Sequence, residues 1–165
     1  IILSYTKSKT MNSTKRSGKP HQKAVVRDEW IDLYGHMNMA YYVMLLDDLG
    51  HRILEQFGLG QGYTLELNCG LFTIEANLKY LREVCASDPL RVELTPLSFD
   101  EKRLVTQVEL YHDEQNYLSA TMEQMAVHVN LDTRKVCPFG DEARRRLQTM
   151  MDAYTSENWN MLARH

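Results

Sequence analysis

The sequence has few cysteines, and their positions exclude two kinds of small-protein architecture. Cys69, Cys85 and Cys137 are odd in number, far apart and without a C-x-x-C pair. Neither a disulfide framework nor a zinc knuckle is expected, and reduced thiols in a cytoplasmic compartment are favoured. The chain also lacks a run of about 18 apolar residues, so no membrane span is predicted. The opening Ile1–Leu3 precedes no apolar core of secretory length, so we expect no signal peptide.

Several common catalytic motifs are missing as well. The sequence contains no Gly-rich phosphate loop, no serine nucleophile elbow and no cluster with the spacing of metal ligands. Nucleotide-driven chemistry and serine hydrolysis on those motifs are therefore not expected. Neither a metal site nor a bound cofactor is predicted from the motifs.

Length and charge indicate one domain preceded by a tail. With 165 residues, 44% of them hydrophobic and 25% charged, the chain can form a single globular domain. Residues 1–20 carry five Lys or Arg and no acid, which leaves 14 basic and 22 acidic side chains in the rest. We predict a disordered basic tail over 1–20 and a domain over 21–165. Five scattered cations are weak support for a nucleic-acid or membrane partner, so none is expected.

The hydrophobic pattern predicts one long helix and five strands. Val43, Leu46, Leu49, Ile53 and Phe57 form a stripe at helical period, after a candidate N-cap at Asn38 and before a stop near Gly58. Apolar and polar residues alternate from 71 to 80, which is typical of a half-buried strand. The expected strands are 23–30, 71–80, 90–95, 104–110 and 117–131, followed by a short helix over 141–151.

The order of these elements predicts the fold class. Four strands in succession, joined by short turns, pair antiparallel. The lone amphipathic helix must cover one face of their sheet. The sequence therefore predicts an α+β domain, with a five-stranded antiparallel sheet wrapped around one long central helix.

The loop before the long helix carries a motif. Asp32, Gly35, His36, Asn38 and Tyr42 follow the spacing D-x-x-G-h-x-N-x-x-x-Y. This motif, placed between a first strand and a helix, resembles the signature of the 4-hydroxybenzoyl-CoA thioesterase family, which has the hotdog fold. The fuller pattern in that family often begins D-T-D, whereas this chain has Trp-Ile-Asp, so the first acid is absent. The resemblance extends over roughly residues 22–148 and implies an acyl-CoA thioesterase.

The resemblance implies a role for each residue of the motif. Asp32 falls on the catalytic carboxylate and would either attack the thioester carbonyl or activate a water. The backbone N–H of Met39, at the positive end of the helix, would stabilise the oxyanion. Gly35 would let the backbone turn tightly. His36 would bond the loop or the substrate, and Asn38 is more readily explained as a helix cap than as a substrate contact. Tyr42 is as well explained by the core as by a pocket wall.

Other residues are candidates with less support. Glu75 lies among Thr73 and Asn77 on the polar face of the second predicted strand and would border a neighbouring subunit's pocket, although an exposed strand carboxylate is the simpler interpretation. Some hotdog thioesterases use an acid on the central helix, and Asp47, Asp48 and Glu55 are available there. Lys102 and Arg103 match a basic position that contacts the nucleotide end of CoA, and Arg82 is a weaker option.

Two other functions share the predicted fold. Hotdog hydratases and dehydratases pair an Asp with a His five residues later, whereas Asp32 and His36 are four apart. A non-catalytic acyl-CoA-binding module would not need the Asp32 carboxylate. By resemblance we expect a homodimer or homotetramer with an acyl-CoA substrate. Related segments also occur near carnitine breakdown, where a trimethylammonium acid is released, and such a group would need acids or aromatics in its pocket.

Overall fold

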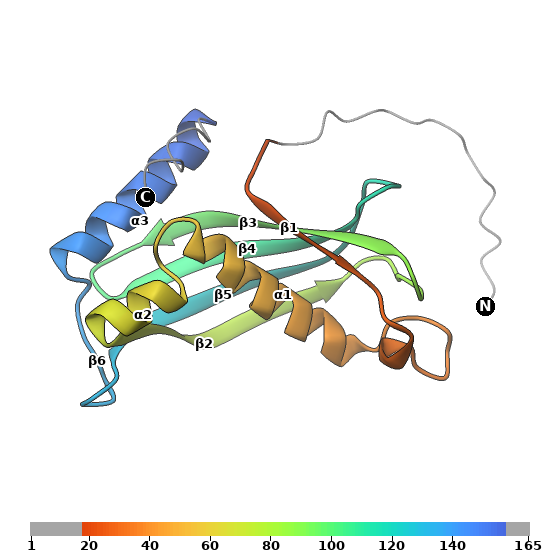
Figure 1. Ribbon diagram of the computed structural model, residues 1–165, viewed down its shortest axis with the longest axis horizontal. Coiled ribbons are helices and arrows are strands. Elements are labelled where there is room, and N and C mark those ends of the chain that lie inside the picture. Colours follow the sequence, from red (N-terminus) through yellow and green to blue (C-terminus); the bar gives the residue numbers. More distant parts are fainter. Residues whose placement is uncertain (1–17, 158–165) are drawn as a thin grey trace.

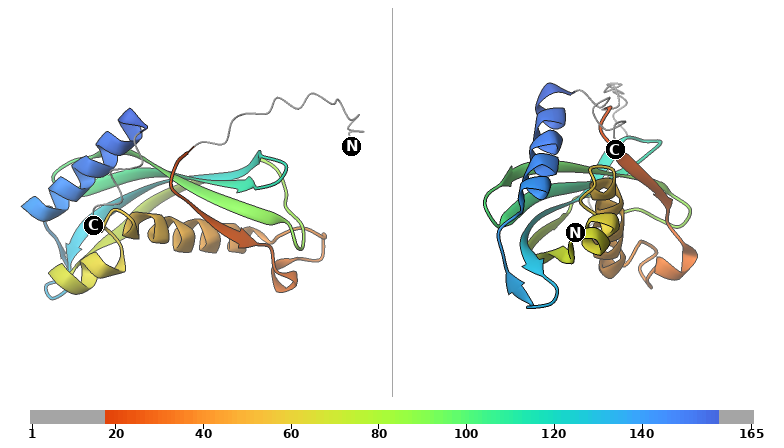
Figure 2. Two further views of the ribbon diagram at one scale, coloured as in Figure 1. Left: turned by 45° about the horizontal axis from the view of Figure 1, so that its top comes forward. Right: turned by 60° about the vertical axis from the view of Figure 1, so that its left-hand side comes forward.

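A computed structural model describes residues 18–157, in which an antiparallel sheet curls around the long helix α1 (Figure 1, Figure 2). The predicted α+β architecture is confirmed. Nearly all of the predicted tail, and residues 158–165 of the predicted domain, lie outside the described residues. No helix in the described part of the chain is long and apolar enough to cross a membrane.

The sheet has six antiparallel strands in the order β1-β3-β4-β5-β2, with the short β6 paired to β5. Their bounds are β1 His21–Val25, β2 Cys69–Tyr80, β3 Pro89–Phe99, β4 Arg103–His112, β5 Tyr117–Asn130 and β6 Lys135–Val136. The helices are α1 Met39–Glu55, α2 Gln61–Leu67 and α3 Asp141–Ser156, and a 3-10 helix η1 covers Asp28–Trp30. The two-residue β6 is the strand that the sequence analysis missed.

Helix α1 begins and packs as its sequence predicts. The Asn38 side chain accepts a hydrogen bond from the Ala40 N–H at 3.0 Å, so Asn38 is the N-cap. Leu46, Leu49 and Ile53 are buried against the sheet. Val43 was expected in the same stripe but is 43% exposed, because the buried face begins one residue earlier, at Tyr42.

The chain leaves α1 through a turn that needs a glycine. Gly58 has a φ of 68°, a left-handed conformation that suits glycine after a helix. The next helix, α2, was not predicted, since it has only seven residues and no side-chain cap. The final helix runs to Ser156, five residues beyond the predicted Met151, because Ala153 continues its buried stripe.

The first strand is shorter than predicted. We expected residues 23–30, but β1 ends at Val25. The backbone of Val26 bonds to the turn before β3, through the O of Asp88 at 3.0 Å and the N–H of Ser87 at 2.9 Å. The chain then turns into η1, which places the Trp30 ring on Tyr41, with ring centroids 5.5 Å apart. The aromatic contact thus belongs to the helix entry and not to the sheet.

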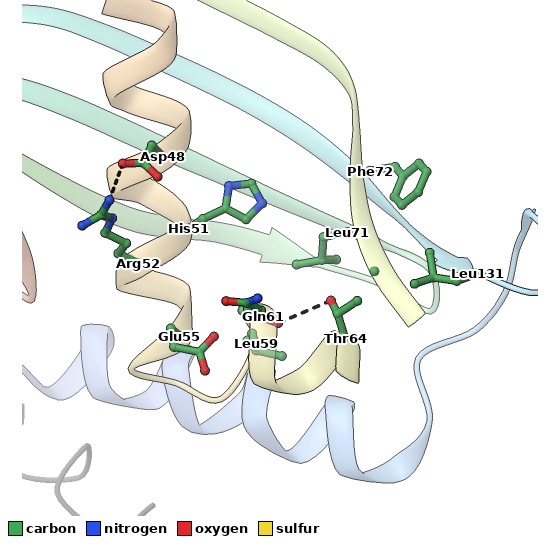
Figure 3. A pocket seen from close by; sticks show the side chains of 12 residues that line it. Asp48, His51, Arg52, Glu55, Leu59, Gln61, Thr64, Leu71, Phe72 and Leu131 are labelled. Carbon is green, nitrogen blue, oxygen red and sulfur yellow. Dashed lines mark hydrogen bonds and ion pairs between the residues drawn. The ribbon is translucent and has the colours of Figure 1, made fainter. Parts of the chain in front are cut away.

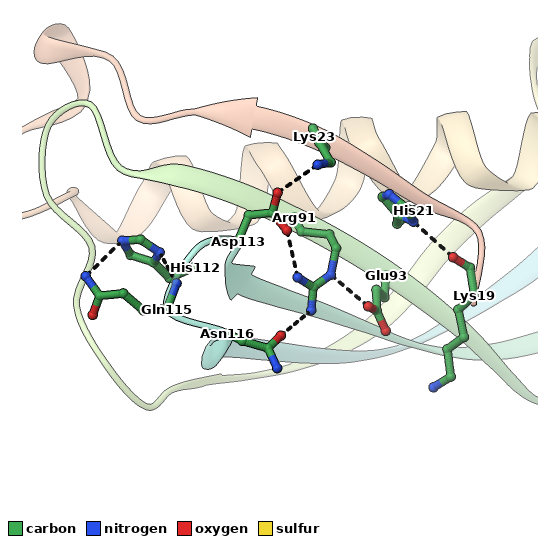
Figure 4. A network of polar contacts seen from close by, with 9 residues as sticks. All are labelled: Lys19, His21, Lys23, Arg91, Glu93, His112, Asp113, Gln115 and Asn116. Carbon is green, nitrogen blue, oxygen red and sulfur yellow. Dashed lines mark hydrogen bonds and ion pairs between the residues drawn. The ribbon is translucent and has the colours of Figure 1, made fainter. Parts of the chain in front are cut away.

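A buried ionic network ties β1 and β3 to the β4–β5 turn (Figure 4). The Arg91 guanidinium donates to Glu93 and Asp113 at 2.8 Å each and to Asn116 at 2.9 Å. Lys23 from β1 also pairs with Asp113 at 2.8 Å. The Arg91 side chain is 5% exposed, so the charges depend on one another for solvation.

Strand β2 is the free edge of the sheet next to β5, and it is exposed along most of its length. We expected one half-buried face, but Phe72 is 41% and Ile74 60% exposed. A β-bulge between Thr73 and Glu75 shifts the register against β5. Because one extra residue exchanges the two faces of a strand, Thr73 and Glu75 lie on opposite faces. Glu75 keeps the face of Asn77, turned away from α1.

Candidate active site

The loop between η1 and α1 holds Asp32 in a closed turn. The Asp32 N–H donates to the His36 carbonyl at 3.1 Å, and the Gly35 N–H donates to the Asp32 carbonyl at 3.0 Å. Oδ1 of Asp32 accepts from the Tyr34 N–H at 2.8 Å. The second oxygen, Oδ2, lies 3.9 Å from Nδ1 of His36, and the side chain is 19% exposed. One carboxylate oxygen is therefore fixed by the loop, and the other is the one available for chemistry.

Gly35 makes this turn possible. Its φ of 86° lies in the left-handed region that other L-residues rarely adopt. A Cβ added there would meet nothing within 4 Å, so the requirement comes from the backbone and not from crowding. This agrees with the role that the sequence predicts for Gly35.

The end of the loop is pinned to the rest of the fold. The Met37 N–H donates to the Val84 carbonyl at 2.9 Å, and the Asn38 N–H donates to the Trp30 carbonyl at 2.9 Å. Met37 is 1% exposed. The loop is therefore anchored to η1 on one side and to the segment after β2 on the other, which fixes Asp32 relative to the start of α1.

The start of α1 presents its first amide next to this loop. Asn38 accepts from the Ala40 N–H through its side-chain oxygen and from the Tyr41 N–H through its carbonyl, at 3.0 and 3.1 Å. The Met39 N–H is the first donor of the helix, at the positive end of its dipole. The capping leaves Met39, and not Ala40, as the candidate oxyanion donor.

A pocket of about 270 Å³ lies beside this helix start. It is lined by His36, Met37, Met39, Tyr42, Tyr80, Leu81, Arg82 and Glu83. The rings of Tyr42 and Tyr80 meet edge to face at 5.3 Å, and the Tyr80 hydroxyl donates to the Met39 carbonyl at 3.3 Å. Burial raises the pKa of Tyr42, which is 4% exposed, so its hydroxyl stays neutral. Tyr42 is thus both core residue and pocket wall.

Arg82 is the cationic residue at the rim of this pocket. The Arg82 guanidinium lies over the Tyr117 ring, 3.8 Å from its centroid. The Tyr117 hydroxyl in turn donates to the Glu83 carbonyl at 2.9 Å, so the rim is held to the start of β5. From the sequence, Arg82 was a weaker candidate for a CoA contact than Lys102 and Arg103. In the structure, Arg82 is the one of the three that lines this pocket.

The turn between β3 and β4, which carries Lys102 and leads into Arg103, lies at the end of the sheet away from the start of α1 (Figure 1). In the sheet, Arg103 pairs with Val127 of β5. The segment after β2 that anchors the Asp32 loop bonds to β5 at Ser119, through the Arg82 N–H. Eight residues of strand separate these points, about 27 Å at ~3.3 Å per residue. Lys102 and Arg103 line a separate cavity of about 430 Å³. Within one chain, Lys102 and Arg103 therefore do not reach Asp32. Glu75, on the outer face of β2, does not reach it either.

Two of the three helix acids, Asp48 and Glu55, line a second, larger pocket of about 710 Å³ (Figure 3). It lies between α1, α2 and the start of β2. Asp48 pairs with Arg52 at 2.9 Å, and Glu55 accepts from the Gly62 N–H at 3.3 Å. Asp47 instead faces His51 at 3.5 Å and does not line this pocket. The three acids have local partners, which agrees with a solvated helix face.

Four residues of the smaller pocket were not predicted as site residues: Met37, Tyr80, Leu81 and Glu83. The alternation of apolar and polar residues over 71–80 placed Tyr80 on the apolar face of its strand. This pattern could have indicated that the Tyr80 side chain points toward α1. Glu83 follows β2 in a segment with no regular pattern, so its neighbours could not be foreseen.

Comparison with known proteins places these features in a family. Residues 26–147 match the thioesterase-like superfamily. A betainyl-CoA thioesterase of Pseudomonas aeruginosa is 30% identical over 129 residues, which are 78% of this chain and 81% of that protein. An L-carnitine dehydrogenase/betainyl-CoA thioesterase of Rhizobium meliloti is 28% identical over 78% of this chain, but the match spans only 26% of its length. A Staphylococcus aureus protein solved in complex with CoA has a TM-score of 0.76 and 27% identity, covering 88% of this chain and 91% of that one.

Proposed function

The chain belongs to the thioesterase-like superfamily and is an acyl-CoA thioesterase of the hotdog fold, and we propose that Asp32 carries its reaction on a small quaternary-ammonium acyl group. The observation that carries this proposal is the Asp32 carboxylate, fixed by the Tyr34 N–H in the loop that leads directly into α1. A thioesterase needs a base or nucleophile and an oxyanion donor, and this loop offers both within a few residues.

The reaction adds water across the C–S bond of the thioester. Oδ2 of Asp32 either takes a proton from that water or attacks the acyl carbon to give a mixed anhydride that water then cleaves. In both routes the carbonyl oxygen becomes an oxyanion and accepts from the Met39 N–H. The CoA sulfur leaves and takes a proton, which yields free acid and thiol. His36, 3.9 Å from Oδ2, would orient the carboxylate or the water.

Acid quenching separates the two routes. The full chain is mixed with a slowly hydrolysed acyl-CoA and quenched with acid within one turnover. The protein and its peptides are then analysed by mass spectrometry. The anhydride route predicts an acyl adduct on the peptide that contains Asp32. The general-base route predicts unmodified protein at every time point.

The acyl group is proposed from the pocket and from the relatives. The relatives named above are called betainyl-CoA thioesterases, and betaine carries a trimethylammonium group. The 270 Å³ pocket is lined by two tyrosines, Tyr42 and Tyr80, and by one acid, Glu83, while the guanidinium of its one cation, Arg82, lies over the Tyr117 ring. Aromatic faces attract quaternary ammonium ions by about 0.5–2 kcal/mol. These are the acids and aromatics that a cationic acyl group requires.

The active unit is proposed to be a homodimer or homotetramer. The free edge of β2 exposes unpaired backbone groups together with the apolar Phe72 and Ile74. Such an edge is normally covered, and pairing with the same edge of a second copy would cover it. A second copy could also bring Glu75, Lys102 and Arg103 toward a pocket that they do not reach in their own chain.

The test of the substrate uses two matched thioesters. Betainyl-CoA and 3,3-dimethylbutyryl-CoA have the same shape, but a neutral carbon replaces the charged nitrogen in the second. We expect kcat/KM, measured by release of free thiol and divided by the rate of uncatalysed hydrolysis of the same ester, to be about tenfold higher for betainyl-CoA, which corresponds to ~1.4 kcal/mol. In Tyr80→Leu the ratio should fall toward one. Equal rates for both esters in the wild type would refute the cationic substrate and leave the thioesterase intact. Binding of CoA esters without any turnover would contradict the enzyme itself.

A further inference from the structure

Two cysteines and a histidine form a cluster near α2 and β6, at the end of the sheet away from Asp32. Cys69 opens β2, His128 lies in β5, and Cys137 directly follows β6. Their sulfur and ring-nitrogen atoms all lie within 4.8 Å of one another. Cys137 Sγ is 3.4 Å from Nδ1 of His128. No part of the proposed thioester chemistry uses these residues.

The strand register explains why the three side chains converge. Cys69 pairs with Asn130, and the Cys137 N–H donates to the His128 carbonyl at 2.9 Å. Because Asn130 and His128 are two residues apart on β5, they project from the same face of the sheet. Cys69 and Cys137 are opposite them on the neighbouring strands, so they project from that face as well.

We propose that Cys69, His128 and Cys137 bind a zinc ion. Zinc prefers thiolate and imidazole ligands in a tetrahedron, with Zn–S near ~2.3 Å and Zn–N near ~2.0 Å. These lengths require the donor atoms to be about 3.5–3.8 Å apart, close to the 3.4 Å between Cys137 Sγ and His128 Nδ1. Two thiolates and a neutral imidazole balance the charge of the ion. Both cysteines are only partly buried, so water can take the fourth position.

Tyr63 contacts the second ring nitrogen of His128, Nε2. The Tyr63 hydroxyl lies 2.6 Å from Nε2 of His128, and both residues are 2% exposed. When Nδ1 binds the metal, Nε2 carries the ring proton and donates it to the Tyr63 oxygen, an arrangement common behind metal-bound histidines. The Tyr63 hydroxyl oxygen has lone pairs that can accept this bond. The Phe139 ring, 4.7 Å away, further fixes the imidazole.

Without metal, the ring contacts are different. Nδ1 lies 3.1 Å from the carbonyl oxygens of both Cys137 and Pro138, so its proton is shared between them. Metal binding replaces these contacts and moves the proton to Nε2. Tyr63 permits the exchange, because a hydroxyl can donate to Nε2 in one state and accept from it in the other.

A disulfide is the competing use of two adjacent cysteines. Nδ1 of His128 lies 3.4 Å from Cys137 Sγ, so a third ligand is already in place beside the two thiols, and a disulfide would not use it. A divalent cation instead removes the repulsion between two thiolates.

The proposed ion would join separate elements. It would connect the start of β2 to the β5–β6 hairpin, and through Tyr63 to α2. The same elements supply Thr64, Leu71 and Leu131 to the wall of the larger pocket. Zinc at this place would therefore stabilise that wall.

Cobalt titration tests the site directly. The reduced, chelator-treated full chain is titrated with Co²⁺, which gives thiolate-to-cobalt and tetrahedral d–d absorption, and Zn²⁺ is then added. We expect one equivalent of cobalt to bind and zinc to displace it and raise Tm. The absorption should vanish in Cys137→Ser and persist in the matched control Cys85→Ser, because Cys85 is exposed and outside the cluster. Circular dichroism of the metal-free variants checks that both are folded.

A milder variant keeps all three ligands. Tyr63→Phe removes only the support of His128, and we expect it to weaken cobalt binding about 10- to 100-fold. Tyr111→Phe, at a half-buried tyrosine outside the cluster, should leave the affinity unchanged. The proposal is overturned by a reduced chain without cobalt absorption, or by absorption that persists in Cys137→Ser. It is equally overturned if the titratable thiols fall from three to one in air whether or not zinc is present, because the pair is then a disulfide.

Discussion

Nδ1 of His36 lies 3.9 Å from Oδ2 of Asp32, while Oδ1 of the same carboxylate accepts from the Tyr34 N–H. The loop therefore gives the two oxygens different tasks. Oδ1 sets the orientation of the group, and Oδ2 is left for water or for the acyl carbon. This division depends on the tight turn at Gly35 and on the cap at Asn38, which fixes the next amides of α1.

The Asn38 cap should affect both stability and turnover. In Asn38→Ala the Ala40 N–H loses its acceptor, and we expect unfolding by urea to require about 1 kcal/mol less free energy. The first amides of α1 are then no longer held, so kcat should fall as well. Asn38→Asp keeps an acceptor oxygen and should recover most of the stability. A kcat that is unchanged in Asn38→Ala would mean that the helix start takes no part in the reaction.

The buried network in Figure 4 should be intolerant of losing its buried cation. Arg91→Met removes the guanidinium that Glu93 and Asp113 share, and only the partly exposed Lys23 still pairs with Asp113. Breaking such a network costs about 3–5 kcal/mol, which chemical denaturation can measure. Arg52→Met, which breaks an exposed pair with Asp48, is the matched control and should cost no more than about 1 kcal/mol. Equal losses in the two variants would contradict the burial argument.

The turn at Asp100 predicts a dependence of stability on pH. Hydrogen bonds from the Lys102 N–H and the Arg103 side chain lower the pKa of Asp100 to about 2. Its pKa is ordinarily near ~3.9 when unfolded, so the stabilisation is complete above that value and is lost as pH falls toward 2. Asp100→Asn should therefore be less stable than wild type at pH 6, with the difference vanishing near pH 2. A difference that is independent of pH would show that the charge is not the cause.

The exposed edge of β2 should control the oligomeric state. Ile74→Lys places a charge on that edge, and charged edge residues oppose strand pairing. We expect light scattering after gel filtration to show a shift from dimer or tetramer toward monomer. Leu65→Lys, at an equally apolar and more exposed position on α2, should leave the assembly unchanged. A wild-type chain that is monomeric at all concentrations would exclude the proposed pairing.

Features set by local sequence were the ones that could be predicted. The stripe Leu46, Leu49 and Ile53 repeats at helical period, and the structure confirms that it is buried. The Asp32 motif is also local, since its turn is closed by residues within a few positions. The family that this chain resembles could therefore be recognised from one short segment.

Features that depend on strand register could not be predicted. The bulge before Glu75 leaves no mark in the alternation of apolar residues, yet it exchanges the faces of β2. The pocket residues Tyr80 and Arg82 reach the Asp32 loop only because β2 ends beside α1. Cys69 and Cys137 are far apart in sequence and meet only across β5, so their spacing gave no metal motif.

The most direct test of the account compares two carboxylates in the same assay. Asp32→Asn keeps an oxygen for the Tyr34 N–H, so the loop should stay folded while the charge is lost. Asp48→Asn removes an acid of the larger pocket in the same conservative way. With the best acyl-CoA, kcat/KM should fall at least about a hundredfold in Asp32→Asn and stay near wild type in Asp48→Asn. Retained turnover in Asp32→Asn, with loss in Asp48→Asn, would contradict the account and assign the reaction to the central helix.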